Sequence, residues 1–161
     1  MSITSMDKDY DNRTLHVVMD FEAPVERVWE LWADPRQLER WWGGPGYPST
    51  VVDHDLTPGG RITYFMTGPE GNRSHGYWSI SSVDAPKSIE LYDGFAHEDG
   101  SPVEEVPPTF MTVRLSEHHG GTRVELRSTF DTREQMEQHV EMGLLDGIRH
   151  AGEQMDVVLA A

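Results

Sequence analysis

The feature that most constrains the fold is the contrast between the end of the chain and the part before it. From about Arg133 to Leu159, apolar residues recur every three or four positions, which predicts one long amphipathic helix. Between residues 49 and 130, apolar residues alternate in short runs bounded by Gly, Pro, Asn and Asp, which is typical of antiparallel strands. Such a helix must lay its apolar stripe on one face of the sheet, so the pattern predicts an α+β fold.

The N-terminal part predicts a strand followed by two short helices. Apolar residues alternate through Leu15–Phe21, and Pro24 then suits the first turn of a helix. Asp34 can cap a second short helix, Pro35–Trp41. Residues 1–11 are polar and acidic and predict a flexible lead-in, whereas residues 12–161 predict a single domain.

Six further strands are predicted in the middle of the chain, which makes a curved antiparallel sheet of about seven strands. They are Ser49–Leu56, Arg61–Thr67, His75–Val83, Ser88–Asp93, Phe110–Glu117 and Thr122–Phe130. The final helix contains Gly143, Gly147 and Gly152, each of which costs a helix interior about 1 kcal/mol relative to Ala. Close approach to the sheet, room for a ligand, and a kink or lid remain open as explanations.

Charge and composition exclude several classes of function. Lys and Arg total 13 while Asp and Glu total 28, so the net charge of −15 repels nucleic acid and anionic lipid. The chain has no cysteine, no signal peptide and no apolar run long enough for a membrane span. We therefore expect a cytoplasmic protein.

No motif of catalysis or metal binding is present in the sequence. The eight histidines form no HExxH pattern, and no Gly-x-Ser-x-Gly elbow occurs. The acids Asp55, Glu90 and Asp93 are conceivable general acids or bases, but nothing in the sequence makes them converge. We assign no catalytic residue, metal or cofactor, and an enzyme is the less favoured reading.

The order and spacing of several short motifs nevertheless resemble a known family over about residues 14–159. The motifs are Phe21–Trp29, Trp32–Pro35, Leu38, Trp41–Gly43, Asp55–Arg61, Gly76–Ile80, Gly120–Val124, Met142–Gly143 and Gly147. Together they resemble the START-like (SRPBCC, helix-grip or Bet v-like) superfamily, in the branch of heat-shock protein 90 ATPase activator homologues. The resemblance implies a helix-grip fold with a hydrophobic cavity between the sheet and the last helix, in which members bind lipids, hormones or polyketides.

Apolar and aromatic side chains on the predicted strands and helices are the candidates for lining that cavity. They are Trp29, Trp41, Trp42, Tyr64, Met66, Trp78, Ile80, Tyr92, Phe110, Val113, Met142, Leu144, Ile148 and Met155. A selective pocket also needs a few polar groups, and the candidates are His54, Arg61, His75 and Arg114.

Three functions remain open at this stage. The first is binding of a hydrophobic or aromatic small molecule by a carrier, sensor or sequestering protein. The second is a cyclase-, aromatase- or hydrolase-like enzyme that uses the same cavity. The third is a co-chaperone-like module with a role in the stress response, which the name of the branch alone suggests. The chain has one predicted domain, whereas the eukaryotic activators that give the branch its name also have a further domain. Contact with a chaperone is therefore the least favoured of the three. A homodimer is expected only from general frequency.

Overall fold

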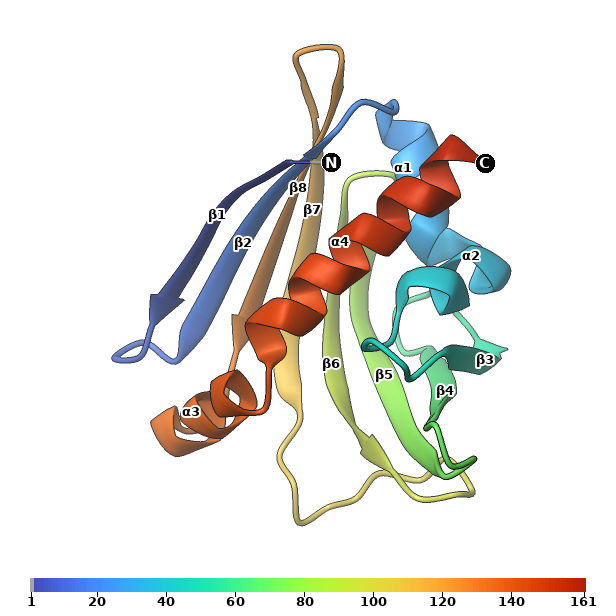
Figure 1. The fold of residues 1–161 in the computed structure, drawn as a ribbon, viewed down its shortest axis with the longest axis vertical. Coiled ribbons are helices and arrows are strands. Elements are labelled where there is room, and N and C mark those ends of the chain that lie inside the picture. The colour runs from blue at the N-terminus through green and yellow to red at the C-terminus, as the bar shows by residue number, and fades with distance from the viewer. Residues whose placement is uncertain (1) are drawn as a thin grey trace.

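An eight-stranded antiparallel sheet curves around the C-terminal helix in the computed structural model, which describes residues 2–161 (Figure 1). The strands are β1 (Ser2–Asp9), β2 (Thr14–Phe21), β3 (Ser49–His54), β4 (Arg61–Thr67), β5 (Arg73–Asp84), β6 (Ser88–Ala96), β7 (Thr109–His118) and β8 (Gly121–Thr129). Their order across the sheet is β1-β2-β8-β7-β6-β5-β4-β3. The helices are α1 (Val25–Ala33), α2 (Pro35–Trp41), α3 (Arg133–Glu141) and α4 (Leu144–Ala160). This arrangement confirms the predicted α+β helix-grip fold.

The segment expected as a flexible lead-in is instead the edge strand β1. It pairs antiparallel with β2, and Ile3 and Met6 pack against the core. A register shift between Ile3 and Ser5 interrupts the alternation of side chains, so no period-2 pattern marks the strand in the sequence. The sheet of the described chain therefore has eight strands where the sequence predicted about seven.

The two short helices form where the sequence predicts them, and α2, which ends at Trp41, packs against β3 and α4. The Asp34 side chain accepts a hydrogen bond from the backbone N–H of Arg36 at 2.9 Å, which caps α2. The indole N–H of Trp41 donates to the carbonyl oxygen of Leu31 at 2.7 Å, which ties α2 to α1. Trp42 directly follows α2 and starts the Gly/Pro-rich loop.

The predicted C-terminal helix is divided into α3 and α4. Gly143 stands between them with φ +97°, a left-handed conformation that glycine adopts at little cost. Thr132 caps α3 by accepting a hydrogen bond from the backbone N–H of Gln135 at 3.1 Å. For Gly143, the kink was therefore the correct explanation.

No helix within residues 2–161 is long and apolar enough to cross a bilayer.

The core fills the space between the concave face of the sheet and the helices. Residues of one parity on each strand point inward, as shown on β2, where the alternate residues from Leu15 to Phe21 are all buried. Met136 of α3 and Met155 and Val158 of α4 close the core from the helical side. The same alternation decides which strand residues can reach a ligand.

Candidate functional site

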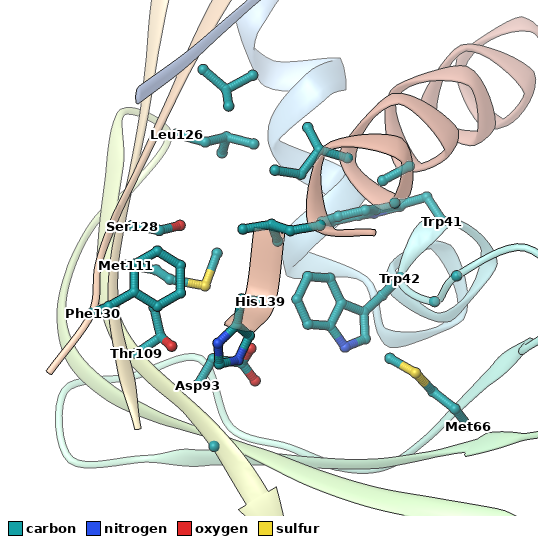
Figure 2. A pocket seen from close by; sticks show the side chains of 18 of the residues that line it. Trp41, Trp42, Met66, Asp93, Thr109, Met111, Leu126, Ser128, Phe130 and His139 are labelled. Atoms are coloured by element: carbon teal, nitrogen blue, oxygen red, sulfur yellow. The ribbon is translucent and has the colours of Figure 1, made fainter. Parts of the chain in front are cut away.

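A cavity of about 270 Å³ lies between the concave face of the sheet and the helices α3 and α4 (Figure 2). Strands β2, β4, β6, β7 and β8 and the end of α2 all contribute to its wall. Most of the lining side chains are apolar: Val17, Met19, Trp41, Trp42, Met66, Phe95, Met111, Leu126, Phe130, Leu144, Ile148, Ala151 and Met155. The wall therefore favours an apolar occupant.

Helix α4 leaves space for that occupant at Gly147. Gly147 lies on the lining stripe of the helix, one turn after Leu144 and next to Ile148. A Cβ atom built at Gly147 would meet no heavy atom within 4 Å apart from its chain neighbours and the nearby backbone of α4 itself. Of the three explanations for the helix glycines, room in the cavity thus describes Gly147, while Gly152 is buried.

A polar pair interrupts the apolar wall on the sheet side. The hydroxyl of Tyr64 on β4 donates a hydrogen bond to Oδ1 of Asp93 on β6 at 2.8 Å. Gly76 on the intervening strand β5 makes room for this contact, because a Cβ there would collide with the Tyr64 ring. Asp93 follows the buried residues Ile89 and Leu91 at two-residue spacing, so the acid continues the inward face of β6.

Burial in this apolar setting shifts the proton equilibria of both groups. Desolvation raises the pKa of Asp93 from 3.8 to about 7, although the Tyr64 hydroxyl and the Trp78 indole act against the rise. Burial also raises the pKa of Tyr64 well above 10, and the nearby charge of Asp93 adds to the effect. Near neutral pH, Asp93 can therefore either donate or accept a proton, while Tyr64 stays protonated.

Edge-to-face aromatic rings form the wall beside this pair. The Trp42 ring lies 5.0 Å from Trp78 and 5.8 Å from both Trp41 and Tyr64, measured between centroids. The indole N–H groups of Trp42 and Trp78 are buried without a well-aligned hydrogen-bond partner among the described residues. The Trp42 indole does approach the Tyr64 hydroxyl, where it counteracts part of the rise in the Tyr64 pKa.

Helix α3 adds two polar side chains that are largely occupied by the fold. Nδ1 of His139 lies 2.8 Å from the carbonyl oxygen of Gln135; since a carbonyl only accepts, Nδ1 carries the proton. The Gln135 amide donates to the carbonyl of Pro107 at 2.8 Å and accepts from the backbone N–H of Asp131 at 3.0 Å. Thr109 and Ser128 complete the polar lining. Within residues 2–161, no three acids or histidines are grouped to hold a metal ion.

The structure brings half of the expected apolar candidates to this wall. These seven are Trp41, Trp42, Tyr64, Met66, Leu144, Ile148 and Met155. Trp78, Ile80 and Val113 are buried in the core outside the cavity lining, and Trp29 is half-buried on α1.

Three other apolar candidates lie on the outside, which corrects the expectation for them. Tyr92 and Phe110 pair on the outer face of the sheet, with centroids 5.0 Å apart, because their neighbours Leu91 and Met111 take the inward parity. Met142 is 76% exposed because it lies at the break between α3 and α4.

None of the four polar candidates lines the cavity, and the expectation is corrected for these too. Arg61 stacks over the ring of Tyr77, and His75 lies 5.7 Å from the ring of Phe65, since both occupy outward positions on β4 and β5. Arg114 is exposed beside the inward Val113. His54, near the end of β3, places Nε2 2.9 Å from the carbonyl oxygen of Trp32 and so joins the strand to α1.

Among the polar residues that do line the cavity, Tyr64 was selected from the sequence only as an aromatic candidate and Asp93 only as a conceivable acid or base, and Thr109, Ser128, Gln135 and His139 were not selected at all. The inward position of Asp93 could have been predicted, because it is an acid on the apolar parity of a strand. His139 lies three residues after the buried Met136, so helical spacing also indicated an inward position. Thr109 and Ser128 carry no such signal.

Comparison with known proteins places this architecture in a family. Residues 22–160 match the family described as activator of Hsp90 ATPase homolog 1-like protein. The crystal structure of protein Ms6760 from Mycobacterium smegmatis has 46% identity and a TM-score of 0.89, with 98% of this chain and 97% of that chain covered. A solution structure from Arthrobacter aurescens has 45% identity and a TM-score of 0.92, covering 99% and 92%.

A more distant relative has the same fold. The solution structure of a Staphylococcus epidermidis protein has 27% identity and a TM-score of 0.87, with 98% of this chain and 94% of that chain covered. No curated protein matches the chain. The family match extends over most of the chain and agrees with the helix-grip architecture. The chain therefore belongs to the family of activator of Hsp90 ATPase homolog 1-like proteins.

Proposed function

We propose that this protein binds an apolar small molecule in the cavity between its sheet and helix α4. The observation that carries the proposal is a largely apolar cavity of about 270 Å³ in which one of the lining positions of α4, Gly147, has no side chain to fill the space. The volume lies just below the usual range for ligand pockets, about 300–1,000 Å³, so it suits a small occupant. The family to which this chain belongs has the START-like fold, and proteins with this fold commonly bind hydrophobic ligands.

Methionine methyl groups offer a direct test, because four of them surround the space. Met19, Met66, Met111 and Met155 line the cavity, whereas Met142 is exposed and serves as an internal control. In spectra of protein labelled with ¹³C at the methionine methyls, 2-ethylnaphthalene should shift the four cavity resonances and leave that of Met142 in place. Unchanged cavity resonances at saturating 2-ethylnaphthalene would contradict the proposal.

A matched pair of variants separates the cavity from the helix that borders it. Gly147→Phe should fill the cavity and abolish the shifts, since the new side chain extends into open space. Val157→Phe places the same ring on α4 at a residue that is 54% exposed, and it should leave binding unchanged. Equal binding by both variants would show that the probe occupies another place.

A second function, catalysis of a proton transfer, is favoured by one observation. The pKa of Asp93 near 7 suits a general acid or base at neutral pH, and the group faces the cavity. If the bound molecule is a substrate, Asp93→Asn should retain its binding and lose its turnover. The co-chaperone alternative has only the description of the family in its support, so we place it behind both.

A further inference from the structure

The hydrogen-bond donors beside Asp93 are already used within the cavity wall. The Tyr64 hydroxyl donates to Oδ1 of Asp93 at 2.8 Å. The buried indole of Trp42 acts on the Tyr64 hydroxyl, and the indole of Trp78 acts on Asp93. The Nδ1–H group of His139 donates to a carbonyl oxygen of its own helix at 2.8 Å. A carboxylate can accept about four hydrogen bonds, so Asp93 can still accept one from a ligand.

The charge of this acid is not balanced by a basic side chain. Asp93 is half-buried and lines the cavity, as Figure 2 shows, whereas no Lys or Arg of the described chain lines it. The groups that act on Asp93 are the neutral side chains of Tyr64 and Trp78. Since folding has already removed most of the water around the acid, a cation that binds there has mainly its own hydration to lose. A second anion would be repelled.

The mouth of the cavity is acidic as well. Phe95 and Pro107 both line the cavity and are exposed, so the cavity reaches solvent between the end of β6 and the start of β7. The connecting segment, residues 97–108, contains neither Lys nor Arg and carries four exposed acids, which are Glu98, Asp99, Glu104 and Glu105. The field of this acidic rim attracts cations and repels anions, and the net charge of −15 has the same sign.

We propose that the ligand is an organic cation, with an apolar body of about one or two rings and one protonated amine that donates a hydrogen bond to Asp93. This inference rests on the proposed function. The apolar wall contacts the rings, the carboxylate pairs with the ammonium group, and the acidic rim draws the molecule to the mouth. The aromatic side chains at the wall also favour a cation, because their ring faces attract positive charge.

Four probes that share a naphthalene body test the chemistry of the polar end. They are 2-(aminomethyl)naphthalene, 2-(hydroxymethyl)naphthalene, 2-ethylnaphthalene and 2-naphthoate, each titrated against the full chain at pH 8 and followed by the methionine methyl resonances. The alcohol has the size of the amine and also donates a hydrogen bond, but it bears no charge. The amine should bind about 10-fold more tightly than the alcohol, as expected for a hydrogen bond between charged groups. The carboxylate should bind most weakly.

Asp93→Asn and the pH dependence identify the group that pairs with the amine. Lowering the pH from 8 to 5.5 protonates Asp93, whose pKa is about 7, so the amine should lose about 10-fold in affinity and the hydrocarbon nothing. Asp93→Asn should remove both this pH dependence and the preference for the amine over the alcohol. Tyr64 and His139 are the other titratable groups of the cavity, and Tyr77 acts on Tyr64. His139→Gln should keep the pH dependence, which separates Asp93 from the histidine.

The rim is tested through the rate of association. The triple variant Glu98→Gln/Glu104→Gln/Glu105→Gln should slow association of the amine about 3-fold at low salt and leave its dissociation rate unchanged. The control removes three exposed acids at α1 and the β7–β8 hairpin, at the other end of the molecule in Figure 1, and should slow association less. Its changes are Glu22→Gln, Glu26→Gln and Glu117→Gln.

The outcomes separate this inference from the function on which it rests. An alcohol that binds as tightly as the amine, a preference for the carboxylate, or an amine affinity that Asp93→Asn leaves unaltered would overturn the assignment of a cation alone. Equal slowing by the two triple variants would overturn the role of the acidic rim. Failure of all four probes, the hydrocarbon included, would instead overturn the proposed function.

Discussion

Asp93 should destabilise the folded protein at neutral and alkaline pH, and its replacement by Asn should reveal the cost. The substitution keeps the size of the side chain and an oxygen that accepts the Tyr64 hydroxyl hydrogen bond of 2.8 Å. It removes the negative charge that the apolar cavity wall disfavours. The other acids are the same in the variant and in the wild type, so the difference between their free energies of unfolding reports on Asp93.

The magnitude follows from the pKa of Asp93. The folded state raises it from 3.8 to about 7, and each tenfold change in proton affinity is worth about 1.4 kcal/mol. The full shift corresponds to about 4 kcal/mol, and partial exposure of the side chain reduces this to about 2–4 kcal/mol. Because the folded state binds the proton more tightly than the unfolded state, Asp93 does not destabilise the wild type below about pH 4, and the wild type loses stability as the pH rises from there to about 7.

Urea denaturation of the two proteins between pH 4 and pH 8.5 measures this difference. Asp93→Asn should match the wild type near pH 4, gain stability relative to it up to about pH 7, and keep a constant advantage above about pH 8. Asp131→Asn, at an exposed residue, is the matched control and should give a small difference that does not vary with pH. A pH-independent difference for Asp93→Asn, or a wild type that is more stable at pH 8, would refute the reasoning.

Three further changes have outcomes that the structure determines. Tyr64→Phe removes a hydroxyl that lowers the pKa of Asp93, so a ¹³C carboxyl titration should place that pKa above 7; a fall would mean that the hydrogen bond is absent. Met136→Ala empties a fully buried position and should cost about 2–5 kcal/mol in urea unfolding, whereas a loss below 1 kcal/mol would show that the core collapses around it. Thr132→Ala removes the cap of α3 and should cost about 1 kcal/mol; no loss in thermal unfolding would indicate that the cap is dispensable.

The strands and the short helices could be predicted because each follows from a local pattern. The alternation from Leu15 to Phe21 is buried residue by residue as the period of a strand requires. Asp34 caps α2 through the hydrogen bond that its position before Pro35 suggested. The bulge in β1 hid a strand for the converse reason, since it breaks the period on which such a prediction depends.

The cavity residues were harder to predict because the hydrophobicity of a residue does not show which face of the strand its side chain occupies. Phe110 and Met111 are both apolar, yet only Met111 lines the cavity, and strand parity alone separates them. Applied to β6, the same parity makes Tyr92 an outer residue and Asp93 an inner one. The number of residues that combine at one wall depends on the curvature of the sheet, which no single segment encodes.

Two departures from good local packing meet at the same cavity, which is the strongest reason to regard it as a site. Gly147 costs α4 about 1 kcal/mol relative to Ala, and Asp93 costs more as an acid facing an apolar wall. Elsewhere on β6, Ile89 and Leu91 obey the simple rule and are fully buried. A wall built only for stability would carry side chains of that kind at both positions. Because one departure leaves space and the other supplies an ionisable group, a ligand with an apolar body and one polar end accounts for both.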